Sequence, residues 1–154
     1  MIIDSGNRET FDTGAVRDIQ KGKGRCDLMP LEVAAAVLCH PSSGDDCVLN
    51  NIAAFQDHKK TSYLHLALSN FADIAYKGDK ETMLLDVSKR FEEGAEKYGE
   101  DNWRKGLPVG CYINSAVRHY LKYRRGDNEE DNAAAFVWNI MCCIWEVDYH
   151  RVEN

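Results

Sequence analysis

The segment from Ala133 to Trp145 is apolar on every side of a helix except at Asn139. Such a helix is stable where other helices surround it, so we expect it in the middle of a bundle. Asn139 is then buried and needs hydrogen-bond partners, which favours a place in a polar network or a functional role. No strand-like alternation of useful length occurs anywhere in the chain. The sequence therefore predicts an all-α fold.

Apolar residues at helical spacing predict five further helices. They cover residues 31–38, 48–55, 63–78, 80–98 and 108–124. The break between the first two is Pro41-Ser42-Ser43-Gly44, and Pro30 and Pro108 suit first helical turns. At 154 residues the chain is most simply one domain. Its parts are an irregular N-terminal arm (1–30), accessory helices for packing or an oligomer surface (31–80) and core helices (81–150).

The helix expected over residues 80–98 concentrates acids near its end. Its apolar stripe is formed by Leu84, Val87, Phe91, Ala95 and Tyr98. Glu92 borders this stripe, whereas Glu93 and Glu96 lie farther round the helix. These carboxylates either face water, with Lys97 as a counter-charge, or hold a cation that turns their repulsion into ligation. The motif alone leaves both interpretations open.

Two groups of basic and polar residues are candidate phosphate sites. The first lies among glycines of the arm, which let backbone amides approach a ligand, and consists of Arg17, Lys21, Lys23 and Arg25. The second forms a stripe on the helix over 108–124 and consists of Asn114, Arg118, Lys122 and Arg125. His119, beside the stripe, either orders a ligand or packs. The alternatives are a solvated tail for the first group and a solvated helix face for the second.

The acidic turn from Gly126 to Asn132 precedes the apolar helix and supplies N-cap candidates. Acids at a helix start stabilise the helix by about 0.3–1 kcal/mol each, so capping is a sufficient role for them.

The net charge, the cysteines and the lengths of the apolar runs argue against several classes of protein. A formal net charge of -6 argues against a nucleic-acid polymer as the main partner, because such proteins usually carry a basic surplus. Six cysteines include no Cys-x-x-Cys pair, and no charged-then-apolar leader precedes them, so we expect reduced thiols in a cytosolic protein. No apolar run reaches the roughly 20 residues that cross a bilayer. A small anion bound through metal is not excluded.

Two sets of short blocks follow one another in a characteristic order. The first set is 11–18 and 22–28, and the second is 93–99, 102–103, 105–106, 115–120, 126–127 and 136–139. With these blocks the chain resembles the phage and bacterial dATP/dGTP diphosphohydrolase-like proteins, relatives of the MazG all-α nucleotide pyrophosphohydrolases. The resemblance covers most of the chain outside residues 39–80. It implies a MazG-like helical bundle in the cytosol of a bacterium or of a phage-infected host.

The resemblance also implies a reaction. A purine deoxynucleoside triphosphate, dATP or dGTP, is cleaved between its α and β phosphates to the monophosphate and pyrophosphate. Mg²⁺ or Mn²⁺ neutralises the triphosphate and lowers the pKa of a bound water, while a carboxylate positions or deprotonates that water. We therefore expect a metal-dependent hydrolase.

The same resemblance indicates which acidic residues bind metal and which are catalytic. Glu92, Glu93 and Glu96 match the Glu-Glu-x-x-Glu element that holds metal in MazG-like enzymes, and Glu93 and Glu96 are the catalytic candidates. The later Glu-x-x-Asp element is altered, because the step from Glu130 lands on Ala133. Asp127 with Glu130, or Asn128 with Asp131, offers the same spacing. The metal candidates are thus Glu92, Glu93, Glu96, Asp127, Glu130 and Asp131.

The resemblance assigns the phosphates to basic residues and the base or sugar to Trp103 or Asn139. The full set of substrate-binding candidates is Arg17, Lys23, Arg25, Lys97, Asn102, Trp103, Arg118, His119 and Asn139. The altered acidic element supports an alternative, a protein that sequesters a nucleotide without hydrolysing it. Under either hypothesis the ligand is a nucleotide, with no nucleic-acid or membrane partner. A homo-oligomer, dimer or tetramer, is expected because MazG-like sites often form between subunits.

Overall fold

The computed structural model of the chain describes residues 2–39 and 46–150. Helices dominate this part of the chain, which confirms the all-α prediction. The elements are α1 (Leu31–Cys39), α2 (Cys47–His58), α3 (Ser62–Tyr76), α4 (Lys80–Tyr98), α5 (Val109–Arg125) and α6 (Asn132–Trp145), with short η1 (Cys26–Leu28), η2 (Asn102–Lys105) and η3 (Glu146–His150). The predicted break at Pro41-Ser42-Ser43-Gly44 lies outside the described residues.

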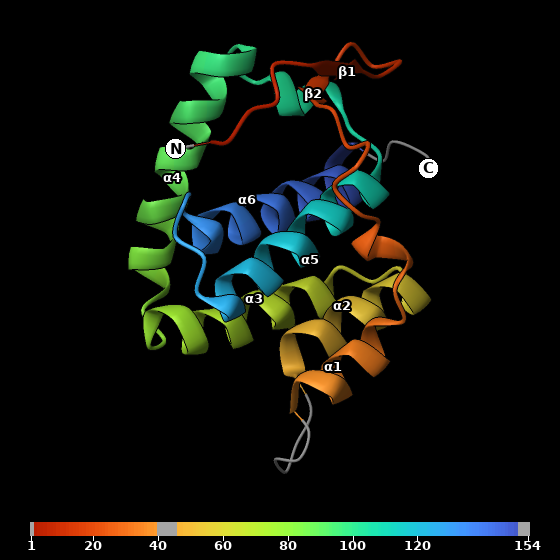
Figure 1. Cartoon of the computed structure of the whole chain (residues 1–154), viewed down its shortest axis with the longest axis vertical. Helices are drawn as coiled ribbons and strands as arrows, with labels where there is room; N and C mark the ends of the chain where they lie inside the picture. The colour runs from red at the N-terminus through yellow and green to blue at the C-terminus, as the bar shows by residue number, and fades with distance from the viewer. Residues whose placement is uncertain (1, 40–45, 151–154) are drawn as a thin grey trace.

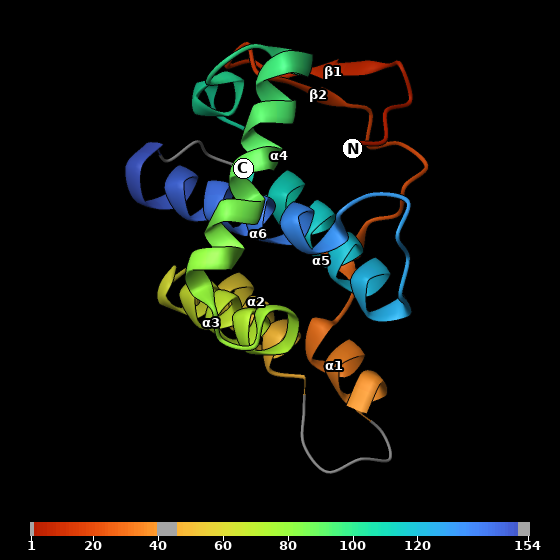
Figure 2. The same ribbon diagram turned by 90° about the vertical axis from the view of Figure 1, so that its left-hand side faces the viewer.

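The helices are arranged around a central pair. In both views α5 and α6 lie side by side in the middle, with α1, α2 and α3 on one side of them (Figures 1 and 2). On the other side lies a small hairpin of two strands. The long helix α4 runs from the α3 end of the molecule past α6 to the hairpin (Figure 1). The site described below lies where α4 and the hairpin meet the central pair.

The hairpin corrects the prediction that the arm is irregular. Strand β1 (Arg8–Thr10) pairs antiparallel with β2 (Val16–Asp18), and Glu9 lies opposite Arg17. The turn is closed by hydrogen bonds from the Phe11 amide to the Ala15 carbonyl and from the Gly14 amide to the Phe11 carbonyl. Three-residue strands are too short to produce a visible alternation, which explains why the sequence pattern missed them.

One side chain fastens the hairpin to the bundle. The Asn102 amide accepts a hydrogen bond from the Val16 amide (3.1 Å) and donates one to the Val16 carbonyl (2.9 Å). Asn102 begins η2, the turn between α4 and α5. Strand β2 is therefore held in a fixed position against the bundle. This also fixes the point from which the side chain of the next residue, Arg17, extends.

The core fills the space between α3, α5 and α6. Phe71 of α3 packs against Phe136 of α6, with ring centroids 4.5 Å apart, and edge-on against Tyr120 of α5 at 6.0 Å. All three rings are fully buried, as expected for aromatic side chains that supply much of a core's apolar area. Asn139 is 2% exposed, so its predicted burial is confirmed.

Helix α4 is rotated relative to the sequence prediction. Met83, Val87 and Arg90 are its buried residues, whereas Leu84 is 48% exposed, so the prediction that Leu84 belongs to the inner stripe is wrong. The buried face of α4 is turned toward Arg90, because Met83 is buried and Leu84 is not. Glu92 consequently does not border the inner face and is exposed, whereas Glu93 is half-buried.

The acidic turn before α6 does cap that helix. Asp131 accepts a hydrogen bond from the Ala134 amide at 2.9 Å, the bond by which an N-cap side chain satisfies a free backbone donor. Among the described cysteines, Cys26, Cys111, Cys142 and Cys143 are free thiols. Among the described helices, none combines the length and the apolar character that a membrane span requires.

Candidate functional site

A cavity of about 440 Å³ lies between the inner face of α4, the start of the arm, η2 and the α5–α6 pair. Its lining divides into two parts that we name by their chemistry. The cationic side includes Arg17, Lys23, Arg90, Arg118 and Lys122. The aromatic side includes Phe91, Trp103 and Trp138. A cavity of this size with both kinds of wall suits a small ligand that has an anionic end and a flat apolar end.

Arg17 and Arg118 meet at one hydroxyl group. The Nη2 atom of Arg17 donates to Ser115 Oγ (2.7 Å) and to Asn139 Oδ1 (2.8 Å), and Nη2 of Arg118 donates to the same Ser115 Oγ (3.1 Å). In residues 2–39 and 46–150, no carboxylate pairs with either guanidinium. Burial lowers the pKa of both side chains, and Arg17 lowers the pKa of Arg118 further. Two cations are thus held close together with only neutral acceptors.

The other cations of the cavity have acidic partners. Arg90 pairs with Glu130 at 3.1 Å, and both side chains are less than a tenth exposed. Lys23 pairs with Asp18 at 2.7 Å. Lys122 pairs with Glu129 at 3.3 Å in a more exposed position. The charge of these three side chains is therefore compensated within the protein.

Three guanidinium nitrogens in the lining have no hydrogen-bond partner although they are buried. They are the Nη1 atoms of Arg17, Arg90 and Arg118. A buried donor without an acceptor is unfavourable by about 1–3 kcal/mol, and more for a charged group. The cationic side thus has unsatisfied donors that an anion with several oxygens can satisfy.

The aromatic side is a row of rings in mutual contact. Phe91 lies 5.6 Å from Trp103 and 5.8 Å from Trp138, measured between ring centroids. Trp103 is backed by Trp145 at 5.0 Å, and the Arg104 guanidinium lies 4.5 Å above the Trp103 ring. The rings come from α4, η2 and α6, so the wall forms only when those elements pack together.

His119 is an uncharged member of the lining. Its Nδ1 lies 2.8 Å from Asn132 Oδ1, and the Asn132 amide donates through Nδ2 to the Asp127 carbonyl. The Asn132 oxygen therefore faces the ring, which makes Nδ1 the protonated nitrogen. Burial and the nearby Arg90, Arg118 and Lys122 lower the pKa of His119 to about 3, against the opposing effect of the Asn132 bond. The imidazole is neutral near pH 7.

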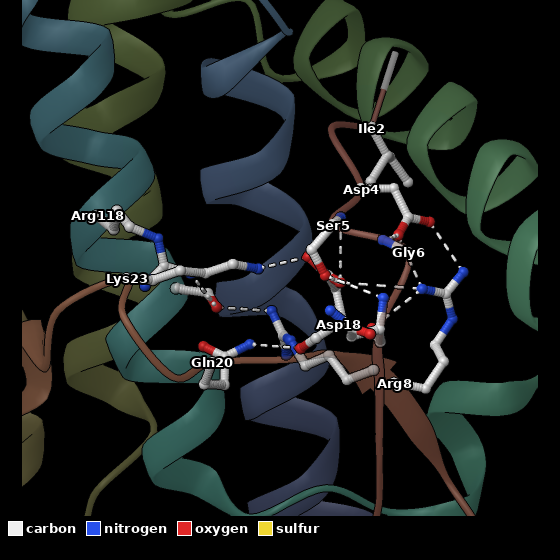
Figure 3. A network of polar contacts seen from close by, with 12 residues as sticks. Ile2, Asp4, Ser5, Gly6, Arg8, Asp18, Gln20, Lys23 and Arg118 are labelled. Atoms are coloured by element: carbon white, nitrogen blue, oxygen red, sulfur yellow. Dashed lines mark hydrogen bonds and ion pairs between the residues drawn. The ribbon is translucent and has the colours of Figure 1, made fainter.

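Residues at the start of the arm line the cavity and belong to a polar network (Figure 3). Asp18 accepts hydrogen bonds from the Ser5 amide, the Ser5 hydroxyl and the Lys23 ammonium. Asp4 is held by Arg8 at 2.8 Å, a bond that lowers the pKa of its carboxyl group well below the usual range. In the view of Figure 3, Lys23 and Arg118 stand at one end of this network and Arg8 at the other.

The comparison with protein families decides the identity of the chain. Residues 54–153, which are 100 of the 154 residues, match the family described as dATP/dGTP diphosphohydrolase, N-terminal. The chain belongs to this family. The match confirms the resemblance that the sequence blocks indicated. No curated protein and no solved structure gave a match to the chain.

The matched range contains some residues of the site and leaves out others. The dATP/dGTP diphosphohydrolase N-terminal family covers α3 to α6, and so includes Trp103, Arg118, His119 and Asn139. The arm with Arg17 and Lys23 precedes the matched range. The two arginines that share Ser115 thus come from different parts of the chain, one inside the matched range and one outside it.

Most substrate-binding candidates from the sequence line the cavity. They are Arg17, Lys23, Asn102, Trp103, Arg118, His119 and Asn139. Two others lie outside the lining: Arg25 pairs with Asp27 in an exposed position, and Lys97 donates to the Ile2 carbonyl and lies near Asp4. The Asn102 amide is occupied at both ends by Val16, so Asn102 anchors the hairpin.

The structure does not bring the six predicted metal ligands together. None of Glu92, Glu93 and Glu96 lines the cavity, Asp127 pairs with Arg125, and Asp131 caps α6. Only Glu130 lines the cavity, where it pairs with Arg90. In the part of the chain that the structure describes, no three His, Cys, Asp or Glu side chains form a group that could hold a metal ion. Spacing along a helix places acids together but does not tell which way they face.

Four residues of the cavity lining, Arg90, Phe91, Ser115 and Trp138, were not among the candidates. Arg90 interrupts the apolar stripe of α4 between Val87 and Phe91, and a cation in such a stripe is itself a signal for a buried polar site. Phe91 was expected only as part of the apolar stripe. Ser115 and Trp138 belong to the sequence blocks 115–120 and 136–139, but nothing in the sequence shows that the Ser115 hydroxyl joins two arginines.

Proposed function

We propose that the chain binds a purine deoxynucleoside triphosphate in this cavity and hydrolyses it to the monophosphate and pyrophosphate. The observation that carries the proposal is the pair Arg17 and Arg118, two cations with neutral partners beside a wall of aromatic rings. Phosphate oxygens are the acceptors that a planar guanidinium fits best, often through two parallel bonds. The printed description of the matched family, dATP/dGTP diphosphohydrolase, supports this choice of ligand.

The two sides of the cavity suggest how the ligand lies. The phosphates contact Arg17 and Arg118, and the base lies against the rings of Trp103, Phe91 or Trp138. Bases stack on aromatic side chains through their flat faces, which contributes affinity with little preference for one base. Discrimination between adenine and guanine then depends on hydrogen bonds to the edge of the base.

The reaction consumes one water molecule. The oxygen of water bonds to one phosphorus of the α–β linkage, and the bond between that same phosphorus and the bridging oxygen breaks. The bridging oxygen leaves with the other phosphorus, the protons of the water pass to product oxygens or to solvent, and the products are the monophosphate and pyrophosphate. Guanidinium groups stabilise charge that builds up on the phosphate oxygens as the bond breaks. Neutral His119 has an Nε2 lone pair and lines the same cavity, where it accepts a hydrogen bond from a ligand or a water molecule.

Mg²⁺ or Mn²⁺ belongs to the proposal through the family resemblance. Its protein ligands would come from the carboxylates of the described residues. Such ions take oxygen ligands from one or two carboxylates together with substrate phosphates. The described acids do not form a converging set, so no step here is assigned to a bound metal. Replacement of Glu93 or Glu96 by glutamine tests the predicted role of the α4 acids: loss of turnover with the fold retained supports that role, and unchanged turnover in both variants contradicts it.

The deciding experiment is product analysis. Purified protein is incubated with each common dNTP and NTP in Mg²⁺, Mn²⁺ or EDTA, and the products are separated by chromatography. We expect a dNMP and pyrophosphate from dATP or dGTP. The absence of product from every nucleotide overturns the hydrolase proposal.

A second function is favoured by the acids that do not converge. A protein with the same cavity sequesters a nucleotide without cleaving it. Calorimetry of the same nucleotides, with chromatography of the recovered ligand, separates the two functions. Tight binding with intact ligand recovered supports sequestration, and product formation removes it.

A further inference from the structure

The cations of the cavity fall into two classes that differ in their partners. Arg90 and Lys23 are neutralised by Glu130 and Asp18. Arg17 and Arg118 are held only by a hydroxyl and an amide, which carry no charge. A buried cation is normally paired with an acid because its desolvation is unfavourable. The second class is therefore the unusual one, and its unneutralised charge needs an explanation.

Asn139 is the residue that determines this difference for Arg17. Its Nδ2 donates to the Ala135 carbonyl at 2.8 Å, which leaves Oδ1 as the atom that faces Arg17. The side chain is 2% exposed and cannot turn over without breaking both bonds. An aspartate has nearly the same shape and would place a carboxylate at the same point. The amide therefore orients the guanidinium and leaves its charge uncompensated.

A purely structural role leaves part of this arrangement unexplained. The Arg17 guanidinium lies 5.8 Å from the Tyr112 ring and 6.0 Å from the Trp138 ring, so cation–π attraction contributes to its packing. That attraction does not satisfy Nη1 of Arg17 or Nη1 of Arg118, which are both buried without an acceptor. Packing also gives no reason for Arg118 to approach Arg17 at the shared Ser115 hydroxyl. An anion between the two guanidinium groups accounts for all of these features.

We infer that Arg17 and Arg118 bind a phosphoryl group of the ligand by direct contact, without a divalent metal, and that Asn139 is the positioning residue that orients Arg17 and leaves its charge uncompensated. The inference rests on the proposed function for the identity of the ligand as a phosphate compound. It assigns a different source of affinity, because the phosphate is held by guanidinium donors and not through carboxylate-bound metal. The probe is inorganic pyrophosphate, which has the phosphates of the ligand and no base.

The test is titration calorimetry of the full chain with pyrophosphate in EDTA. We expect binding that weakens as salt is added, because the contact is between charges. Asn139→Asp should weaken binding by about 30-fold or more, since it neutralises Arg17 in place. The matched control is Asn70→Asp, which adds the same charge between α2 and α3 and keeps an acceptor for the Asn51 side chain. We expect its affinity to equal that of the natural chain.

Circular dichroism and thermal unfolding accompany each titration, so that loss of the fold is recognised. If Asn139→Asp does not fold, Arg118→Gln is titrated in its place, because Arg118 is only partly buried; loss of binding is expected there too. Equal pyrophosphate affinity in the natural chain and in the folded variant overturns the role of Asn139 or of Arg118.

The outcomes separate this inference from the proposed function. Metal-dependent hydrolysis of a dNTP without any pyrophosphate binding in EDTA overturns the inference and leaves the enzyme. Pyrophosphate binding in EDTA with no hydrolysis in any metal supports the inference and removes the enzyme.

Discussion

The two sides of the cavity differ in how complete they are without a ligand. On the aromatic side Phe91 contacts both Trp103 and Trp138, so each ring already has an apolar neighbour, and among these three described rings the one buried donor without an acceptor is Trp138 Nε1, a neutral group. On the cationic side Arg17 and Arg118 each have a buried donor without an acceptor. If the cavity binds the proposed ligand, we expect the aromatic side to give the cavity its shape and the cationic side to supply most of the affinity. Substitutions on each side can test this division.

The largest effect is expected from Arg17→Met, which keeps the length of the side chain and removes its charge. If the phosphates depend on the arginine pair, kcat/KM for dATP or dGTP falls about 1,000-fold, equivalent to about 4 kcal/mol. Steady-state kinetics measures this, or ligand affinity if no turnover occurs. Arg25→Met is the matched control, because Arg25 is exposed and pairs with Asp27. A similar loss in both variants would show that the general charge of the arm matters and not the pair.

The next largest effect concerns a cation that is already paired. Glu130→Ala leaves Arg90 buried without its acid, so the free energy of unfolding should fall by about 3 kcal/mol. Urea unfolding followed by circular dichroism measures the change. The double variant Arg90→Met/Glu130→Ala should recover part of the loss, since no buried charge is then left alone. A double variant no more stable than the single one speaks against the ion pair as the cause.

On the aromatic side the expected effect is smaller. Trp103→Ala removes a stacking surface and should weaken nucleotide binding by about 10-fold, in line with about 1–3 kcal/mol for a stacked base. Pyrophosphate, which has no base, should bind to this variant as before. Trp145→Ala removes the ring behind Trp103 but not a lining residue, so its effect should be smaller still. If Trp103→Ala weakens binding of pyrophosphate as strongly as that of nucleotide, the division of the cavity is wrong.

The smallest effect is a pH dependence of stability. The pKa of His119 is about 3 in the folded chain and near 6.5 in a free histidine, so between these values the unfolded chain binds more protons. Stability should therefore fall as the pH is lowered below 6.5, by about 1 kcal/mol from pH 6.5 to 5.5, and stay level above it. Unfolding of the natural chain and of His119→Gln at several pH values measures this slope. The carboxyl pKa of Asp18 is lowered, so its contribution is lost only near or below pH 4 and lies outside this window.

The bundle was predictable because its signals are local. Ala133 to Trp145 is apolar all round, and that alone requires a central helix with a buried Asn139. The bounds of α4 and α5 follow from the spacing of apolar residues and from Pro108. The rotation of α4 does not follow from the pattern, since Met83 and Leu84 are both apolar and the packing of the helices decides which one is buried.

Some basic residues that line the cavity were predictable from the sequence, whereas their hydrogen-bond partners were not. Basic residues of the arm and of α5 were candidates for phosphate contacts, and Arg17, Lys23 and Arg118 line one cavity. Which of them is neutralised depends on hydrogen bonds between residues far apart in the chain, such as the bond from Arg17 to Asn139 across 122 positions. The direction of the α4 acids depends on the same long-range packing. No pattern within one helix predicts which basic residue is neutralised or which way the α4 acids face.

The separation between Arg17 and Asn139 has a consequence for the synthesis of the protein. Chains leave the ribosome from the N-terminus, so the arm emerges long before α6, which carries Asn139 and Trp138. Until that helix has emerged, Arg17 has no amide to orient it and one wall of the cavity does not exist. A nascent chain that has not yet released α6 therefore has both arginines but no binding site, and ligand capture becomes a marker that synthesis has passed this helix.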